Sequence, residues 1–180
     1  MTELRGHIRK ERGFTLVELI VVIAIVGILS AIGTFAFHQW QVKSNVEAQV
    51  RQMLADFSGI RFRALTTKQK HSIIINRDSY QFKQYNNEDD LPAAGTVVPG
   101  GTHAVRYQLM MSSTTPFSGQ IYEIDPQGLI DIDGGLFPGE IIPVLVSYEG
   151  ATANLDCVNI HVARVSAGKT NTSGVTCDER

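Results

Sequence analysis

The chain has 180 residues and few of the residue patterns that build catalytic sites. It contains no Cys-x-x-Cys pair, no phosphate-binding loop, no Gly-x-Ser-x-Gly elbow and no His-Glu-x-x-His helix. Asp131 and Asp133 have the spacing of the first two ligands of a calcium loop, but the later ligands are missing. The histidines are scattered: His7, His38, His71, His103 and His161. We therefore predict no catalytic residue, no metal, no cofactor and no enzymatic activity.

Proline and charge are absent from long stretches of the N-terminal third. No proline occurs before Pro92, so a helix can run unbroken from Phe14 to about Thr67. No charged residue occurs between Leu19 and Val42, and the nineteen residues 19–37 are almost purely apolar. A helix rising ~1.5 Å per residue needs about this length to cross a hydrocarbon core ~30 Å thick. The run therefore predicts a transmembrane helix.

The charges that flank this run predict its orientation. Basic residues precede it, which places the N-terminus in the cytoplasm by the positive-inside rule; they are Arg5, Arg9, Lys10 and Arg12. One acid, Glu18, lies just inside the apolar block. Because a carboxylate in lipid costs about 2.5–3.5 kcal/mol, we expect Glu18 to pair with another group. The formal net charge of −2 does not favour nucleic-acid binding.

The segment Gly13-Phe14-Thr15-Leu16-Val17-Glu18, followed by the apolar run, resembles the N-terminus of type IV prepilins and type II secretion pseudopilins. The resemblance implies that a prepilin peptidase cuts after Gly13 and N-methylates Phe14. It also implies that Glu18 pairs with the terminal amine of a neighbouring subunit. The implied partners are the peptidase, other pilins or pseudopilins and an inner-membrane assembly platform.

Electrostatics agrees with this role for Glu18. Cleavage would create an amine at Phe14 close in depth to the carboxylate, and opposite charges attract far more strongly in a low dielectric than in water. Glu18 lies four residues from Phe14, so a pair within one helix is also possible. In a bundle of staggered helices, the amine could instead reach a neighbour's carboxylate and set the axial register.

Two other interpretations of the N-terminus are open. It could be a secretory signal cleaved at the small residues Ala31-Ile32-Gly33, or a signal anchor that holds a periplasmic domain. Mass spectrometry of the mature N-terminus separates the three, because they leave methylated Phe14, Thr34 or uncut Met1.

The second half of the predicted helix is amphipathic. Its apolar residues recur at spacings of three and four, which predicts a stripe that packs on a sheet: Val46, Val50, Met53, Leu54, Phe57, Ile60, Ala64 and Leu65. We expect four segments: a leader at 1–13, a transmembrane or filament-core helix at 14–42, an amphipathic helix half at 43–70 and a β-rich periplasmic or extracellular domain at 71–180.

The rest of the chain predicts short strands. We expect hairpins at 72–85 and 121–132 and strands at 104–111, 141–148 and 157–165. Residues 86–103 and the tail from Ser166 are expected to be loops. The prediction is an α+β, type IV pilin-like fold with one long N-terminal helix packed on an antiparallel sheet or sandwich.

This order also resembles minor pilins and pseudopilins of the GspH/FimT type. The features that carry it are a helix end at residues 60–65 followed at once by a strand, the turn at 124–128 and the late strand at 158–162. Members that capture DNA have a basic Gly-Arg motif in the tail. Here that place reads Val162-Ala163-Arg164-Val165-Ser166-Ala167-Gly168-Lys169, so nucleic-acid binding is not expected.

The two cysteines, Cys157 and Cys177, both lie in the region expected to be exported. An even number of thiols in such a region predicts a disulfide. The bond would hold the tail on the sheet and stabilise the fold by roughly 3 kcal/mol in the entropy model.

These features favour a structural subunit. The chain is expected to wait in the inner membrane as a single-pass protein with a periplasmic domain, and then to enter a type IV pilus or a type II secretion pseudopilus. The resemblance to minor subunits favours a place at the tip or in the initiation complex. The alternatives are a DNA-binding or adhesive minor pilin, and a membrane-anchored periplasmic domain unrelated to filaments.

Overall fold

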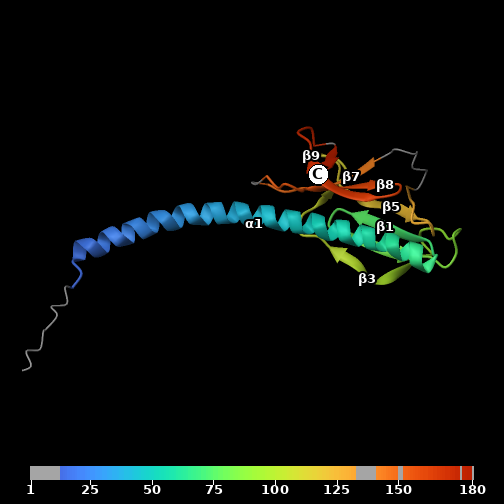
Figure 1. Cartoon of the computed structure of the whole chain (residues 1–180), viewed down its shortest axis with the longest axis horizontal. Coiled ribbons are helices and arrows are strands. Elements are labelled where there is room, and N and C mark those ends of the chain that lie inside the picture. The colour runs from blue at the N-terminus through green and yellow to red at the C-terminus, as the bar shows by residue number, and fades with distance from the viewer. Residues whose placement is uncertain (1–12, 133–140, 150–151, 175, 180) are drawn as a thin grey trace, which may run out of the picture. The chain divides into compact units, whose positions relative to one another are not determined.

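The computed structural model describes residues 13–132, 141–149, 152–174 and 176–179 (Figure 1). A helix, α1 (Leu16–Thr67), is followed by the strands. Contacts divide the chain into two units, Met1–His38 and Gln39–Arg180, and the boundary falls within α1. The helix ends where Lys68 adopts a left-handed φ of 54° and donates its N–H to the Ala64 carbonyl.

The strands form two antiparallel sheets of five strands each. One has the order β3-β2-β1-β5-β6 and the other β10-β9-β8-β7-β4. We call them sheet A and sheet B. Sheet A consists of β1 (His71–Asn76), β2 (Ser79–Gln84), β3 (Thr96–Ala104), β5 (Ser118–Ile124) and β6 (Ile130–Ile132). Sheet B consists of β4 (Leu109–Met110), β7 (Ile141–Val146), β8 (Cys157–His161), β9 (Val165–Thr170) and β10 (Cys177–Glu179).

One apolar core joins both sheets to the second half of α1. The predicted helix stripe is buried at Val46, Val50, Met53, Phe57, Ile60 and Ala64, whereas Leu65 is more exposed. The same cluster contains Ile73 and Phe82 of sheet A and Val144 and Ile160 of sheet B. The predicted α+β class is therefore confirmed. The finer description of the sheets as a sandwich stays a prediction.

Both predicted hairpins are present. β1 pairs with β2 from His71↔Gln84 to Ile75↔Tyr80, and β5 pairs with β6 from Tyr122↔Ile132 to Ile124↔Ile130. In each hairpin, β-branched and aromatic residues flank a turn of the expected composition, and the turn fixes the register.

Three strand predictions were wrong. Residues 96–103, expected to be loop, belong to β3, because an edge strand tolerates Pro99 where a central strand would not. The strand expected at 104–111 is reduced to the two residues of β4. The backbone N–H and C=O of Tyr107 hydrogen-bond to the Gln49 side chain and are therefore not available to a neighbouring strand. The tail expected to be loop forms β9 and β10, which the disulfide holds against β8.

Candidate functional site

The N-terminal segment begins its helix with a capping interaction. The Thr15 hydroxyl accepts the backbone N–H of Glu18 at 3.2 Å, and the Leu19 N–H donates to the Thr15 carbonyl at 3.2 Å. Thr15 is therefore the N-cap, and Glu18 occupies the third helical position. A negative charge there also interacts favourably with the positive end of the helix dipole. The signal for this cap is the Thr-x-x-Glu pattern, which sequence reasoning had used only as a processing motif.

The apolar side chains after the cap have no cover in the described part of the chain. Between Leu16 and Leu29 the large ones are 48–73% exposed. Two polar residues that follow this segment bond to their own helix: Ser30 Oγ donates to the Val26 carbonyl at 2.7 Å, and Thr34 Oγ1 donates to the Ala31 carbonyl at 3.0 Å. An all-round apolar helix of this kind must be buried against other helices or lipid.

The predicted transmembrane helix is not confirmed. Over the described residues, no helix combines the length and the apolar character that crossing a membrane requires.

The second half of α1 anchors the loops of the β-rich unit through polar side chains. Gln49 accepts the N–H groups of Arg106 and Tyr107 at 3.0 and 2.9 Å, and donates to the Tyr107 carbonyl at 2.9 Å. The buried Glu47 accepts the Asn154 N–H at 3.0 Å and the Arg51 guanidinium at 2.9 Å. These two donors, the backbone N–H first, lower the pKa of Glu47 although burial acts in the opposite direction.

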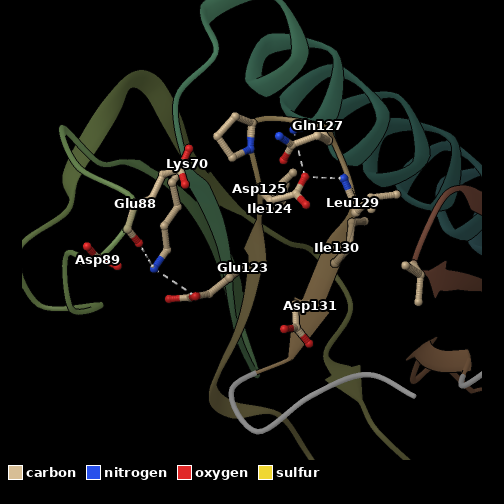
Figure 2. A pocket seen from close by; sticks show the side chains of 12 residues that line it. Lys70, Glu88, Asp89, Glu123, Ile124, Asp125, Gln127, Leu129, Ile130 and Asp131 are labelled. Carbon is tan, nitrogen blue, oxygen red and sulfur yellow. Dashed lines mark hydrogen bonds and ion pairs between the residues drawn. The ribbon is translucent and has the colours of Figure 1, made fainter. Parts of the chain in front are cut away.

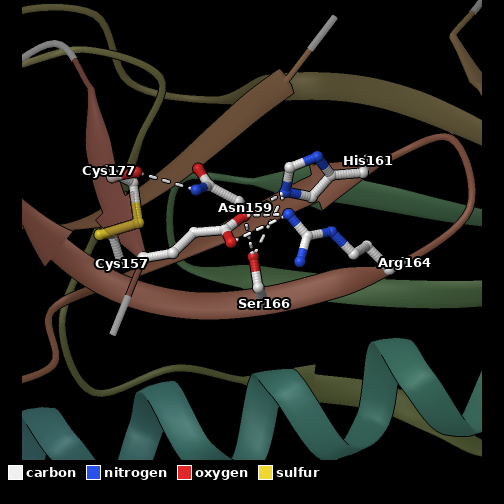
Figure 3. Close-up of polar contacts among 7 residues, drawn as sticks. Cys157, Asn159, His161, Arg164, Ser166 and Cys177 are labelled. Carbon is white, nitrogen blue, oxygen red and sulfur yellow. Dashed lines mark hydrogen bonds and ion pairs between the residues drawn. A yellow bond between two sulfur atoms is a disulfide. The ribbon is translucent and has the colours of Figure 1, made fainter. Parts of the chain in front are cut away.

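The predicted disulfide is present. Cys157 at the start of β8 bonds to Cys177 at the start of β10 with a Cα–Cα distance of 5.9 Å (Figure 3). A polar network on the same strands adds to it: Glu179 accepts Arg164 through both carboxylate oxygens at 2.9 Å. The disulfide and this network hold β10 in place against sheet B.

The same network includes a serine, a histidine and an acid, but their geometry differs from that of a catalytic triad. His161 Nε2 lies 3.3 Å from Ser166 Oγ and 2.7 Å from Glu179 Oε1. In a triad, the serine and the acid contact different ring nitrogens, so that one proton can pass along the line. Here both contact Nε2, and the Ser166 hydroxyl itself donates to Glu179 at 2.8 Å. The arrangement fixes a strand rather than activating a nucleophile.

The other basic residue of this stretch also bonds within the domain. Lys169 Nζ donates to the Ala153 carbonyl at 3.0 Å. Arg164 bonds to Glu179. Both basic residues of the stretch 162–169 therefore have partners within their own chain.

A hollow of about 540 Å³ with an acidic lining lies beside β5 and β6 (Figure 2). Lys70 reaches across its wall, with Nζ 2.9 Å from Glu123 and 3.0 Å from the Glu88 carbonyl oxygen. Within the described residues, no group of three or more histidine, cysteine or acidic side chains could hold a metal ion. Asp133, which has the spacing of a calcium-loop residue in the sequence, lies outside the described residues.

Comparison with known proteins adds one finding, and it falls on the N-terminal segment. Residues 8–34 match the model of the prokaryotic N-terminal methylation motif. The chain carries this motif. The match includes Gly13, Phe14 and Glu18 and ends inside α1. Neither a curated protein nor a solved structure matches the chain.

The methylation motif supports a type IV pilin-like family and indicates a pilin-like or pseudopilin subunit. It implies processing by prepilin peptidase and assembly with other pilins, and it suggests a membrane-anchored protein. Members that carry it are structural subunits rather than enzymes. The GspH/FimT type is not confirmed, since the match covers only 8–34.

Proposed function

We propose that the chain is a minor pilin or pseudopilin, a structural subunit at the tip or in the initiation complex of a type IV pilus or a type II secretion pseudopilus. One observation carries the proposal: the methylation motif coincides with a capped helix whose apolar side chains are exposed. Such a helix needs a cover, and copies or relatives of the same helix can provide it in a filament.

In this proposal the precursor is a single-pass protein of the inner membrane. The basic leader at 1–13 keeps the N-terminus in the cytoplasm, residues 14–42 lie in the membrane and later in the filament core, the amphipathic half at 43–70 carries the domain, and residues 71–180 are periplasmic. Prepilin peptidase cuts between Gly13 and Phe14 and methylates the new amine. The inner-membrane assembly platform then moves the subunit into the filament.

Glu18 sets the register in this proposal. Its carboxylate lies in the first helical turn beside the cleavage site, and it is the one charge of the helix before Lys43. A methylated amine that enters a neighbour's apolar surface needs a counter-charge, because an unpaired charge in a low dielectric is costly. The stagger of two helices that pairs the amine with Glu18 is therefore preferred over other staggers.

Two measurements test the proposal. Mass spectrometry of the mature chain should find N-methylated Phe14, whereas a terminus at Met1 or Thr34 would exclude filament processing. Glu18→Ala and Glu18→Gln should enter the membrane normally but incorporate poorly into filaments, because both remove the charge. Glu18→Asp keeps the charge and serves as the matched control, with incorporation closer to that of the wild type. Normal incorporation of Glu18→Gln would show that the charge does not set the register.

A further inference from the structure

The outer face of sheet B has an apolar hollow that nothing in the described part of the chain fills. Its volume is about 390 Å³, and its lining is Met111, Ile141, Pro143, Asn159, Thr176 and Cys177. Along β8, Val158 and Ile160 point into the core, so Asn159 between them faces the opposite side of the sheet. The hollow therefore lies away from α1.

Asn159, which lines the hollow, carries one polar atom that lacks a partner. Asn159 is 1% exposed, and its Nδ2 donates to the Cys177 carbonyl at 2.8 Å (Figure 3). Its Oδ1 is buried and has no hydrogen bond to any residue that the structure describes. A buried acceptor left in this state is unfavourable, so the packing around Asn159 is not optimal in the isolated chain.

The edge of β7 beside the hollow is open. Counting only described residues, β4 pairs with Leu145 and Val146 alone, so this side of β7 has no strand next to Ile141 or Pro143. On the other side, β8 pairs with β7 continuously from Ile141 to Leu145. The edge is thus free over the part of the strand that lines the hollow.

The backbone groups at this edge follow from the alternation along the strand. Val146 donates its N–H toward the segment before β8, and Ser147 donates toward the segment before β4. Because strand residues alternate between the two sides, Ile141 and Pro143 direct their backbone groups to the open edge. Proline has no N–H. The open edge therefore offers the backbone carbonyls of Ile141 and Pro143 but the N–H of Ile141 alone.

We propose that this edge and hollow form a docking site for an extended segment of a neighbouring subunit, which adds as a strand beside β7. Strand addition satisfies the backbone groups of the edge, and a side chain on the same face enters the hollow. That side chain would be apolar and uncharged, because most of the lining of the hollow is apolar. A charged side chain is less suitable because the apolar lining would desolvate it.

The excess of acceptors also decides against a second copy of the same edge. Two β7 edges placed side by side would each bring more carbonyls than N–H groups and would leave carbonyls unpaired. The occupant is therefore a proline-free segment of a different surface. The inference depends on the proposed function only in naming a filament neighbour as its source.

Hydrogen exchange at single-residue resolution tests the site in the full chain. In detergent micelles the Ile141 amide should exchange with little protection at any protein concentration, and in the assembled filament its exchange should slow at least tenfold. The Val144 amide, directed toward β8, is the internal control and should be protected in both states. Protection of Ile141 in the isolated chain, protection that rises with concentration, or no protection in filaments would each overturn the proposal.

A pair of substitutions gives an independent test. Ile141 and Val97 are each 48% exposed. Val97 lies on β3, the edge strand of sheet A, and Ile141 lies on the part of β7 that β4 does not pair with in the described structure. Ile141→Lys should reduce incorporation into filaments at least tenfold with an unchanged unfolding midpoint, because it places a charge at the hollow. Val97→Lys makes the same change on β3 and should have little effect.

The outcomes separate this inference from the proposed function. Failure of the wild-type chain to enter filaments would contradict the proposed function. If the wild type enters and Ile141→Lys enters equally well, the docking site is wrong and the proposed function stands.

Discussion

Replacement of Gln49 by leucine tests how α1 holds the β-rich unit. Gln49 lies on the helix face next to the connection between β3 and β4. Its side-chain amide hydrogen-bonds to backbone N–H and C=O groups of that connection, as a neighbouring strand would. It makes three hydrogen bonds, two to Tyr107 and one to the Arg106 N–H. Leucine keeps an apolar stem of similar volume, is one atom shorter, and can make none of these hydrogen bonds.

The expected cost follows from the burial of each partner. A net hydrogen bond contributes about 1 kcal/mol to stability, and a buried group left without a partner costs about 1–3 kcal/mol. The bond to the Arg106 N–H is exposed, so water can replace it at little cost, whereas both bonds to Tyr107 are partly buried. The free energy of unfolding should therefore fall by about 2 kcal/mol.

Urea unfolding of the full chain in detergent, followed by circular dichroism, measures this loss. Gln52→Leu is the matched control. Gln52 lies three residues along the same helix, and its side chain bonds to Asp56 at an exposed position, with no other partner among the described residues. Its cost should stay below about 0.5 kcal/mol. If the two variants lose equal stability, the Gln49 amide does not hold the connection, and helix propensity or detergent binding accounts for both losses.

Two further predictions concern the C-terminal strands and the pH dependence of stability. The double variant Cys157→Ala, Cys177→Ala should lower the free energy of unfolding by about 3 kcal/mol, as expected for a bond that closes a loop of this length. The reduced wild type should show the same loss. A loss below about 1 kcal/mol would show that the polar network on Glu179 is enough to hold β10 in place. Burial lowers the pKa of His71 from its ordinary value of 6.5, the Gln69 carbonyl acts against this shift, and Arg63 adds to it. The unfolded chain therefore binds this proton first, and stability should be full above pH 6.5 and fall as the pH drops toward the lowered pKa, by at most about 1.4 kcal/mol per pH unit. His71→Leu should flatten this slope between pH 6.5 and 5 in pH-dependent urea unfolding, and an unchanged slope would assign it to other groups.

The parts of the fold that were predictable from the sequence are those in which one local pattern decides the structure. The hairpin of β1 and β2 has β-branched and aromatic residues on both sides of a polar turn, and the same signals mark β5 and β6. The helix stripe was predictable because buried residues recur every three or four positions along it. Leu65 was predicted to be buried but is partly exposed, because the stripe ends there, beside Gly128 at the surface. The disulfide followed from cysteine number and the expected export.

Other elements depend on partners far along the chain and have no local signal. β9 reads Val-Ser-Ala-Gly-Lys-Thr, a composition typical of a loop. Gly168 is nevertheless required there, because a Cβ would lie 2.3 Å from the Asp178 carbonyl oxygen and 2.9 Å from Cys177 Sγ. The strand exists because β10 and the disulfide pass over this position, and only a residue without a side chain allows that approach.

The docking edge on β7 was hidden from the sequence for the same reason. Pro143 lowers the strand propensity of its segment, and the sequence alone does not indicate which neighbour would lose a hydrogen bond to it. In the fold Pro143 lies opposite Asn159 of β8, and both side chains are on the outer face of sheet B. The position where Pro143 lacks an N–H faces the open edge of β7 and not β8. A proline at that position leaves the pairing with β8 intact and makes the edge selective, because a strand that lacks one donor pairs best with a segment that provides donors. Placing alanine at Pro143 would restore the N–H and should relax that selectivity, so that the isolated chain begins to self-associate through β7; a chain that stays monomeric would argue that the proline has a purely conformational role.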